Sequence, residues 1–293
     1  MFGTRALAID IGGTKFEVAV VDGAGSVTER ARVSSKGAAD GEELFDRLVG
    51  LIDGVDLAAL DVCGVGSGGP MRRGGVAVSP LNIGVWRDFA LRERVAAATG
   101  LTTFVDNDAK ALALAEGWLG AARGVANYIG MVVSTGVGGG IVLDGRLLDG
   151  DDGNAGHIGH VVVEPGGTEL PGHLRGVLEA EASGTAIAFR TGADARHADR
   201  EERRRAGTMV GRAVGSVANL LDLQLAVVAG SVALGFGDEF FAAAQAEIDR
   251  VAVLQHSVGT RIIPAGLGSD GPIVGAAAVG FAGLGHELLG AAS

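Results

Sequence analysis

The feature that most constrains this chain is a glycine turn near its beginning. Strand-like runs at residues 6–10 and 16–21 flank the motif Asp10-Ile11-Gly12-Gly13-Thr14-Lys15. The two glycines let backbone N–H groups approach a polyanion, the threonine adds a hydroxyl donor, and the lysine adds a positive charge. The motif predicts a phosphate-binding turn in which Asp10 holds a magnesium ion through water. The alternative is an ordinary hairpin turn, because Gly-Gly pairs commonly join two strands.

A second turn with the same chemistry lies further along the chain. The motif Ser134-Thr135-Gly136-Val137-Gly138-Gly139-Gly140 again stands between two strand-like runs and places hydroxyl groups before glycines. Neither turn matches the P-loop, which ends in Gly-Lys-Ser/Thr, or the dinucleotide fingerprint between a strand and a helix. The two turns together predict a nucleotide-binding site in which each turn contacts the phosphates from one side. Thr135 and Gly136 are the expected contacts of the second turn.

The order of strand-like and helix-like segments predicts two α/β lobes. An antiparallel meander at residues 6–33 leads into alternating helices and strands, and the same order restarts at residues 127–143. The 293 residues, 47% of them hydrophobic, can bury a substantial core. We expect an N-terminal lobe at residues 1–117 and a larger C-terminal lobe at 118–274, with a cleft between them. A final apolar helix, about residues 275–293, is expected to pack back on the first lobe.

Between the two turns, a strand-like run ends in three polar residues just before a helix begins. The run is Phe104-Val105-Asp106-Asn107-Asp108-Ala109. At the mouth of the cleft, Asp108 is placed to take the proton from an attacking hydroxyl group, and Asn107 to hold a neighbouring hydroxyl. The alternative is helix N-capping, for which Asn and Asp are preferred. Capping needs only one of the three polar residues, so the run also predicts a catalytic base.

Charge and cysteine content argue against several classes of protein. The net charge of -11 and the pI near 5.0 argue against a nucleic-acid partner, which would need a basic face. The single cysteine, Cys63, excludes an intrachain disulfide. No signal-peptide pattern is present, and no uninterrupted apolar stretch reaches the roughly 20 residues of a membrane span. The expectation is a cytoplasmic enzyme without a membrane partner.

Taken in order, these motifs resemble those of the ROK family, named for repressors, open reading frames and kinases. The resemblance covers nearly the whole chain and rests on residues 10–15, Asn107-Asp108, residues 134–140, Ala155-Gly156-His157-Ile158-Gly159-His160 and Leu178-Glu179-Ala180. It implies the two-lobed actin-like ATPase fold and transfer of the ATP γ-phosphoryl group to a hexose, usually to the 6-hydroxyl of glucose or an N-acylated hexosamine. Mg²⁺ as a cofactor and a dimeric or tetrameric homo-oligomer are implied as well. ATP and polyphosphate both stay open as phosphoryl donors.

The resemblance also implies roles for individual residues. Asp108 corresponds to the catalytic base. The sugar contacts correspond to Gly68, Asn82, Asn107, His160 and Glu179. The loop Val228-Ala229-Gly230-Ser231 corresponds to the loop that meets the adenosine, with Gly230 and Ser231 as its contacts.

The sequence departs from the family pattern at a zinc site. Many of these kinases hold zinc with one His and three Cys. The matching positions here are Leu170, Gly172 and Val177, so only His160 survives. An isolated His cannot make a closed tetrahedral site, so no structural zinc is expected. A second imidazole in the same loop, His173, is expected to belong to a hydrogen-bonded loop.

A second departure is His157, which stands where the family presents a Glu to the sugar. A carboxylate only accepts hydrogen bonds, whereas an imidazole donates or accepts them. The change therefore predicts an altered preference among sugar hydroxyl or amino groups. The alternative is that His157 merely packs in its loop.

Two rival functions are weighed against a hexose kinase. ROK repressors carry a DNA-binding helical domain before the glycine turn, whereas this chain has five residues before its first strand and is acidic. A sugar-binding protein without catalysis would fit the altered zinc loop, but the presence of Asp108 argues against it. The sequence therefore favours an ATP-dependent hexose kinase.

Overall fold

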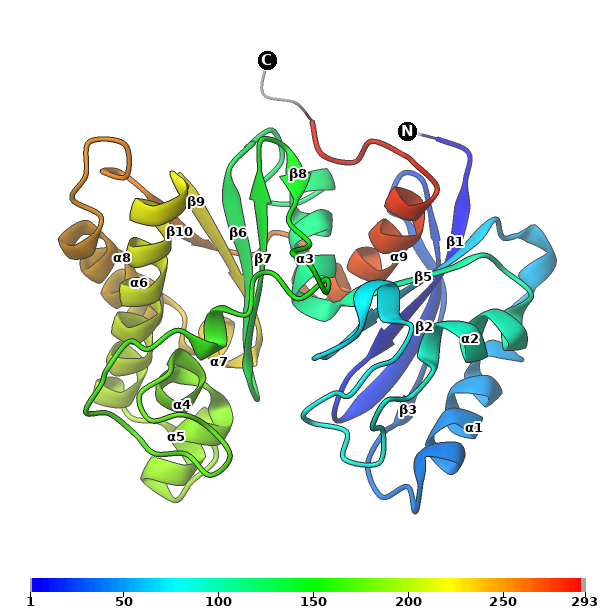
Figure 1. Cartoon of the computed structure of the whole chain (residues 1–293), viewed down its shortest axis with the longest axis horizontal. Coiled ribbons are helices and arrows are strands. Elements are labelled where there is room, and N and C mark those ends of the chain that lie inside the picture. Colours follow the sequence, from blue (N-terminus) through cyan, green and yellow to red (C-terminus); the bar gives the residue numbers. More distant parts are fainter. Residues whose placement is uncertain (1, 291–293) are drawn as a thin grey trace. The chain divides into compact units, whose positions relative to one another are not determined.

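The computed structural model describes residues 2–290, which form two compact units. Unit 1 contains residues 2–119, Leu148–Ala155 and Leu267–Gly290, and unit 2 contains Gly120–Leu147 and Gly156–Gly266 (Figure 1). Residues 291–293, the end of the expected final helix, lie outside the described part, as does Met1. Within residues 2–290, every helix is too short or too polar to cross a membrane.

Unit 1 is built on a five-stranded mixed sheet with the order β3-β2-β1-β4-β5. Strand β2 pairs antiparallel with β1 and β3, as the expected meander requires, and β1-β4 and β4-β5 are parallel pairs. Its strands are β1 (Arg5–Ile11), β2 (Lys15–Asp22), β3 (Val27–Ser34), β4 (Val62–Ser67) and β5 (Thr103–Asn107). Its helices are α1 (Gly41–Ile52), α2 (Leu91–Thr99), α3 (Asp108–Trp118) and α9 (Gly271–Gly283).

The last helix of unit 1, α9, packs against β1, β4 and α3 (Figure 1). Every residue from Ile273 to Phe281 is buried, which explains why its sequence is apolar on all sides. The helix comes so close to β4 that a Cβ atom on Gly64 would lie 2.0 Å from the carbonyl oxygen of Ala276. Only glycine permits this approach, because it has no side chain to displace.

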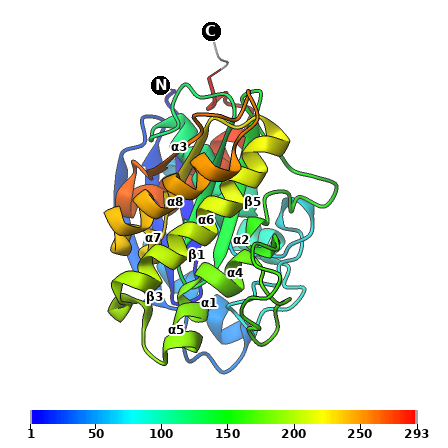
Figure 2. The ribbon, with the colours of Figure 1, turned by 90° about the vertical axis from the view of Figure 1, so that its left-hand side faces the viewer.

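Unit 2 repeats the strand arrangement of unit 1, with the order β8-β7-β6-β9-β10. The hairpin β6-β7 is antiparallel, and β6-β9 and β9-β10 are parallel. Its strands are β6 (Tyr128–Val133), β7 (Val137–Leu143), β8 (Arg146–Leu147), β9 (Leu225–Ala229) and β10 (Arg261–Pro264). Its helices are α4 (Leu178–Ala182), α5 (Gly184–Thr191), α6 (Arg200–Leu221), α7 (Ser231–Phe236) and α8 (Asp238–Val251). The long helices α6 and α8 lie side by side (Figure 2).

Helices α4, α5, α7 and α9 differ from the sequence-based expectation. The spacing of apolar residues predicts one helix from Leu178 to Arg190. The segment instead forms two helices, because Ser183 is extended (φ -72°, ψ 156°) and its hydroxyl accepts a hydrogen bond from the N–H of Ala186 as the N-cap of α5. Helix α9 runs from Gly271 to Gly283, whereas the expected helix ran over about residues 275–293; Pro272 stands in its first turn, where proline is tolerated. The short helix α7 was not predicted.

Residues 148–155, which were expected in the C-terminal lobe, belong to unit 1. The Asn154 side chain donates to the carbonyl of Met71 (2.8 Å) and accepts from its N–H (3.2 Å). The ammonium of Lys110 donates to Asp149 Oδ1 (2.7 Å) and to the Gly153 carbonyl (3.2 Å). These contacts join residues far apart in sequence, so a polar loop composition does not reveal them.

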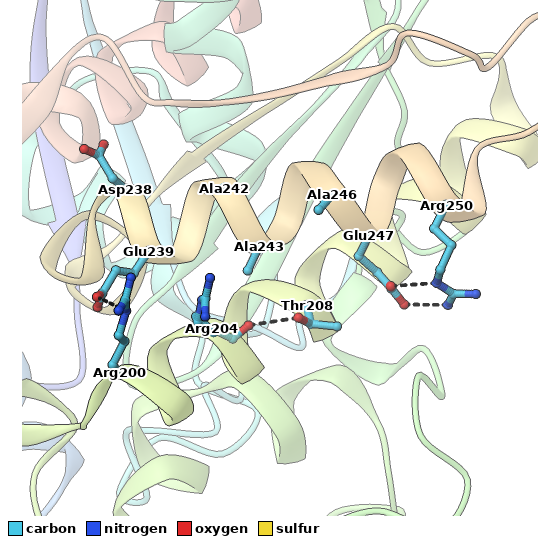
Figure 3. A pocket seen from close by; sticks show the side chains of 10 residues that line it. All are labelled: Arg200, Arg204, Thr208, Asp238, Glu239, Ala242, Ala243, Ala246, Glu247 and Arg250. Atoms are coloured by element: carbon cyan, nitrogen blue, oxygen red, sulfur yellow. Dashed lines mark hydrogen bonds and ion pairs between the residues drawn. The ribbon is translucent and has the colours of Figure 1, made fainter.

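Helices α6 and α8 border a groove of about 610 Å³ (Figure 3). Three alanines of α8, Ala242, Ala243 and Ala246, line it together with charged residues of both helices. None of the residues predicted to carry chemistry lines this groove, so it is not the candidate site.

Glu247, at this groove, is tied to two arginines. Its carboxylate accepts hydrogen bonds from Arg250 (2.7 and 2.8 Å) and Arg212 (2.9 Å), of which the Arg250 pair is drawn in Figure 3. The hydrogen bonds from Arg250, reinforced by Arg212 and opposed by burial, lower the pKa of Glu247 from 4.5 to about 2. A carboxyl group whose pKa is lowered by folding stabilises the protein above its unfolded-state pKa and loses that contribution as pH falls.

We therefore expect Glu247→Gln to lower the free energy of unfolding by about 1–2 kcal/mol near neutral pH, after allowance for solvent screening at the exposed Arg250. The difference from wild type should shrink as pH falls from 4.5 towards about 2. Urea unfolding of both proteins at several pH values measures this difference in the free energy of unfolding. Glu239→Gln is the matched control, because Glu239 pairs with the exposed Arg200. A penalty for Glu247→Gln that does not depend on pH would contradict the assignment.

Candidate functional site

The first glycine turn is the tight connection between β1 and β2. The N–H of Gly12 donates to the carbonyl of Lys15 (3.0 Å), and the hydroxyl of Ser35 donates to the carbonyl of Gly12 (2.9 Å). Asn82 packs directly on the turn, since a Cβ atom on Gly13 would lie 2.7 Å from its Cγ. A Cβ atom on Gly68 would lie 3.4 Å from Oδ1 of the same asparagine. The structure thus brings Gly13, Gly68 and Asn82 together.

Lys15 is paired with a buried carboxylate that the sequence analysis did not consider. Its Nζ lies 2.5 Å from Oε2 of Glu17, which is 1% exposed. Arg30 and Arg32 of β3 also contact this carboxylate, at 2.9 and 2.7 Å. Burial alone would raise the pKa of Glu17, but the hydrogen bonds from Arg32 and Lys15 and the nearby charges lower it overall. Two arginines alternating on one strand beside a lone acidic residue in an apolar strand are the sequence signal for this cluster.

Asp10 and Asp108 form an electrostatically coupled pair in unit 1. Burial, then the charge of Asp108, raise the pKa of Asp10 to about 7, although the charge of Lys15 opposes the shift. Burial also raises the pKa of Asp108 above its usual range, against the lowering effect of the N–H groups of Ala109 and of Asp108 itself. Two carboxylates near each other in a poorly hydrated place favour a bound cation or proton. Asp10 is therefore chemically suited to a magnesium ion held through water.

The polar residues at the end of β5 and the start of α3 have different roles. Asn107 is the N-cap of α3, and its Oδ1 accepts from the N–H of Ala109 (3.0 Å). Asp108, the first residue of α3, accepts from the same N–H (2.8 Å). A helix N-terminus stabilises a carboxylate through its unpaired N–H groups. The capping alternative thus holds for Asn107, and its amide nitrogen takes no part in the cap.

Lys110 anchors the helix that begins with Asp108. Its side chain is 2% exposed, and its Nζ lies 2.8 Å from Asp106 Oδ1 and 2.7 Å from Asp149 Oδ1. Sequence reasoning missed this residue. The signal was a single charge inside the apolar run of residues 109–115, where a buried lysine requires partners.

The second glycine turn connects β6 and β7 in unit 2. Oε2 of Glu179 accepts a hydrogen bond from the N–H of Val137 (2.6 Å), and a Cβ atom on Gly136 would lie 2.7 Å from the same oxygen. The hydroxyl of Thr185 donates to the carbonyl of Thr135 (2.8 Å). Gly136 thus leaves room for the carboxylate of Glu179 at the turn.

The predicted adenosine loop reaches the same turn. The Ser134 and Ser231 hydroxyl oxygens lie 2.9 Å apart. Gly230 has φ 103°, and a Cβ atom there would lie 2.3 Å from the carbonyl oxygen of Val133. Glycine is required here both by the positive φ and by the close approach of two backbone segments. Within unit 2, the predicted turn residues, Glu179 and the predicted adenosine loop are therefore in contact.

The predicted histidine loop lies along β7. His157 is half-buried and His160 is exposed, and their ring centroids are 6.0 Å apart. Burial, followed by the proximity of His160, lowers the pKa of His157, although Glu179 opposes the shift. The neutral imidazole is therefore favoured, and its Nε2 is buried without a hydrogen-bond partner among the described residues. A buried ring nitrogen without a partner is a candidate for contact with a ligand.

The positions that match the family's cysteines carry no metal ligands. Leu170 and Val177 are 4% and 1% exposed and form a small apolar cluster with Ala180 and Ala186. Gly172 has no side chain. Within residues 2–290, no group of three or more His, Cys, Asp or Glu side chains is arranged to hold a metal ion. The donor set does not fit zinc, because apolar packing occupies the thiolate positions.

The fold and the motifs define a two-unit α/β protein with the actin-like ATPase fold. The family model described as ROK family matches residues 6–280, and the chain therefore belongs to the ROK family. It is 37% identical over 247 residues to an N-acetylmannosamine kinase of Citrobacter koseri, covering 79% of this chain and 84% of that one. It is 38% identical over 186 residues to a glucokinase of Thermotoga maritima, covering 62% of this chain but only 58% of that protein.

A solved structure supports the same fold. The ROK family glucokinase from Streptomyces griseus, in complex with glucose and AMPPNP, is similar with a TM-score of 0.81 and 26% sequence identity. The match covers 94% of this chain and 99% of that one. The similarity thus extends over nearly all of both chains.

Proposed function

We propose that this protein is an ATP-dependent sugar kinase, which phosphorylates a hexose, most favourably the 6-hydroxyl of glucose or a related amino sugar. The observation that carries the proposal is the Asp108 carboxylate, held at the start of α3 and coupled to Asp10 beside the first glycine turn. The kinase names of its relatives and the glucose and AMPPNP in a similar structure support the sugar, the nucleotide and the direction of transfer.

In this proposal Asp108 is the general base. As the sugar hydroxyl oxygen forms its bond to the γ-phosphorus, its proton passes to the Asp108 carboxylate and the bond from phosphorus to the ADP oxygen breaks. A Mg²⁺ ion near Asp10, when bound, would neutralise charge on the phosphates. Most of the rate enhancement in such a transfer comes from positioning.

The remaining residues hold the two substrates. Backbone N–H groups at the glycine turns face the phosphates, with Thr14 and Thr135 as hydroxyl donors. The residues proposed for the nucleotide are Gly12, Gly13, Thr14, Lys15, Thr135, Gly136, Gly230 and Ser231. Those proposed for the sugar are Gly68, Asn82, Asn107, His157, His160 and Glu179. The neutral imidazole of His157 can donate a hydrogen bond to a sugar hydroxyl or accept one from it.

Release of ADP, measured across a panel of sugars, tests the proposal. Glucose, mannose, N-acetylmannosamine, N-acetylglucosamine and glucosamine are compared with ATP or polyphosphate as the donor, and the phosphorylated carbon is identified by NMR. Sugar-dependent ADP release with phosphate on carbon six is expected. ADP release that is independent of every sugar, or no release at all, would overturn the proposal.

The pH dependence of kcat/KM follows from the shifted pKa of Asp108. A general base works only when deprotonated, so activity should fall as pH decreases through its pKa. Because burial raises the pKa of Asp108 above 3.8, the acid limb should lie at higher pH than for an ordinary aspartate. Initial rates between about pH 4 and 9, with enzyme stability checked at each pH, measure this limb. A rate independent of pH down to about 4 would contradict it.

Zinc is expected to be absent from the purified protein. Elemental analysis should find well below one zinc per chain, and treatment with a chelator followed by Mg²⁺ should leave activity unchanged. The reason is that Leu170, Gly172 and Val177 offer no ligand atoms. One bound zinc per chain would contradict this reading.

The assembly state and the cellular compartment belong to the same proposal. We infer a cytoplasmic homo-oligomer, a dimer or tetramer, from the resemblance to ROK kinases. Sedimentation velocity of the purified chain tests the assembly, and a monomer at micromolar concentration would overturn it.

A further inference from the structure

Glu179 is held at one carboxylate oxygen and approached at the other. Oε2 accepts the N–H of Val137 (2.6 Å), and Nδ1 of His173 lies 3.4 Å from Oε1. The two side chains are 14% and 18% exposed, so water has little access to the pair. An imidazole–carboxylate contact shielded from water is stronger than the same contact at the surface.

His173 is itself held in place by its loop. Its N–H donates to the carbonyl of Leu170 (3.0 Å), and the bridge between Val162 and Val177 closes the loop. Leu170 and Val177 then pack in an apolar cluster with Ala180 of α4 and Ala186 of α5. Apolar packing thus fixes a loop that presents an imidazole to Glu179.

The Nδ1 atom of His173 is buried and makes no hydrogen bond among the described residues. A buried polar atom without a partner is costly, and Oε1 of Glu179 is an acceptor that lies 3.4 Å away. A small rotation of the imidazole would bring Nδ1 within hydrogen-bonding distance. The geometry therefore points to a hydrogen bond from His173 to Glu179 in the working enzyme.

We propose that His173 is a positioning residue, which orients the Glu179 carboxylate to accept a sugar hydroxyl. This inference rests on the proposed kinase function and deepens it. With Val137 N–H on one oxygen and His173 on the other, the remaining lone pairs of Glu179 point in a fixed direction. A preoriented acceptor binds its hydroxyl with less loss of side-chain freedom, so the effect falls on sugar affinity.

A metal-based role for the same imidazole is the competing explanation. The centroids of His157 and His160, and of His160 and His173, are each 6.0 Å apart. Within residues 2–290, however, these side chains and Glu179 do not form a group that could hold a metal ion. The direct contact of His173 with Glu179 is therefore the arrangement to test.

The test measures steady-state constants for three variants. His173→Ala should raise the KM for the sugar by roughly tenfold, the size of one lost hydrogen bond to a charged group, with kcat and the KM for ATP changed less than about twofold. His173→Asn keeps an N–H donor near the position of Nδ1 and should restore the KM to within about threefold of wild type. His197→Ala, at an exposed histidine of unit 2, is the matched control and should match wild type.

A double-mutant cycle separates positioning from a general structural role. In a Glu179→Ala background, His173→Ala should have no further effect on sugar affinity, measured by calorimetry. The same tenfold loss in that background would overturn the proposal, as would a lower Tm with unchanged sugar affinity. Zinc bound by wild type and lost in His173→Ala would replace it with a metal site.

The experiment also distinguishes this inference from the proposed function. If no sugar is phosphorylated, the kinase proposal fails, while calorimetry of sugar binding still tests His173. If the enzyme is active and His173→Ala leaves both the KM and the affinity for the sugar unchanged, only the inference about His173 fails.

Discussion

Asp108→Asn should lower kcat by about 10²–10⁴-fold, the range that a positioned general base contributes. The amide nearly preserves the shape of the carboxylate but cannot take up the hydroxyl proton. The N-cap hydrogen bond from the N–H of Ala109 to Oδ1 of Asn107 is untouched, so α3 should begin at the same residue. Binding of sugar and nucleotide should change little, because the loss is confined to proton transfer.

Coupled ADP release and calorimetric binding of the sugar measure the two halves of this prediction. Asp53→Asn, at the exposed C-cap of α1, is the matched control and should retain full activity. Undiminished turnover by Asp108→Asn would remove the assigned mechanism. Loss of activity together with loss of sugar binding would instead make Asp108 a binding residue.

Lys110→Met should destabilise the protein by about 2–3 kcal/mol, because it leaves the largely buried Asp106 without its ammonium partner, while the half-exposed Asp149 is screened by solvent. The variant leaves Asp106 and Asp149 side by side without the ammonium that lies 2.8 and 2.7 Å from them. Burial already raises the pKa of Asp106, and Lys110 is the main group that opposes the shift. Loss of the lysine should also weaken the attachment of residues 148–155 to unit 1, although the hydrogen bonds between Asn154 and Met71 remain.

Thermal or urea unfolding measures the loss. Lys36→Met replaces an exposed lysine and should change the free energy of unfolding by less than about 0.5 kcal/mol. Adding Asp106→Asn to Lys110→Met should recover part of the lost stability, because it removes one uncompensated charge. A loss below about 1 kcal/mol for Lys110→Met would mean that the network is solvated in solution.

Local sequence patterns predicted the features that depend on neighbouring residues. The glycine turn after β1, the Asn107-Asp108 start of α3 and the restart of the strand order at β6 all follow from side-chain alternation, turn chemistry and capping. The ROK family assignment, the actin-like fold and the kinase class rest on the same motifs and agree with the family match and the similar proteins. The roles of the individual site residues stay predictions.

The ends of helices were harder to predict where one residue interrupts a segment that has a continuous helical pattern. Residues 178–190 have one helical pattern, yet Ser183 divides them because its hydroxyl caps α5. Helix α9 is buried on all sides, so its sequence is apolar throughout. No alternation of polar and apolar residues within it marks the position where the helix begins.

By itself, the sequence of this protein determined the two glycine turns, the carboxylate at the start of α3 and the absence of thiolates in the histidine loop, because each depends on residues close together in the chain. Only the tertiary structure decided that Arg32 pairs with Glu17, that Lys110 holds Asp149, and that His173 approaches Glu179. Phosphate binding at the first glycine turn stays a proposal, and Lys15 of that turn already pairs with the carboxylate of Glu17. Partners for a buried charge are chosen by the packing of distant segments, since desolvation penalises any charge that the fold leaves alone.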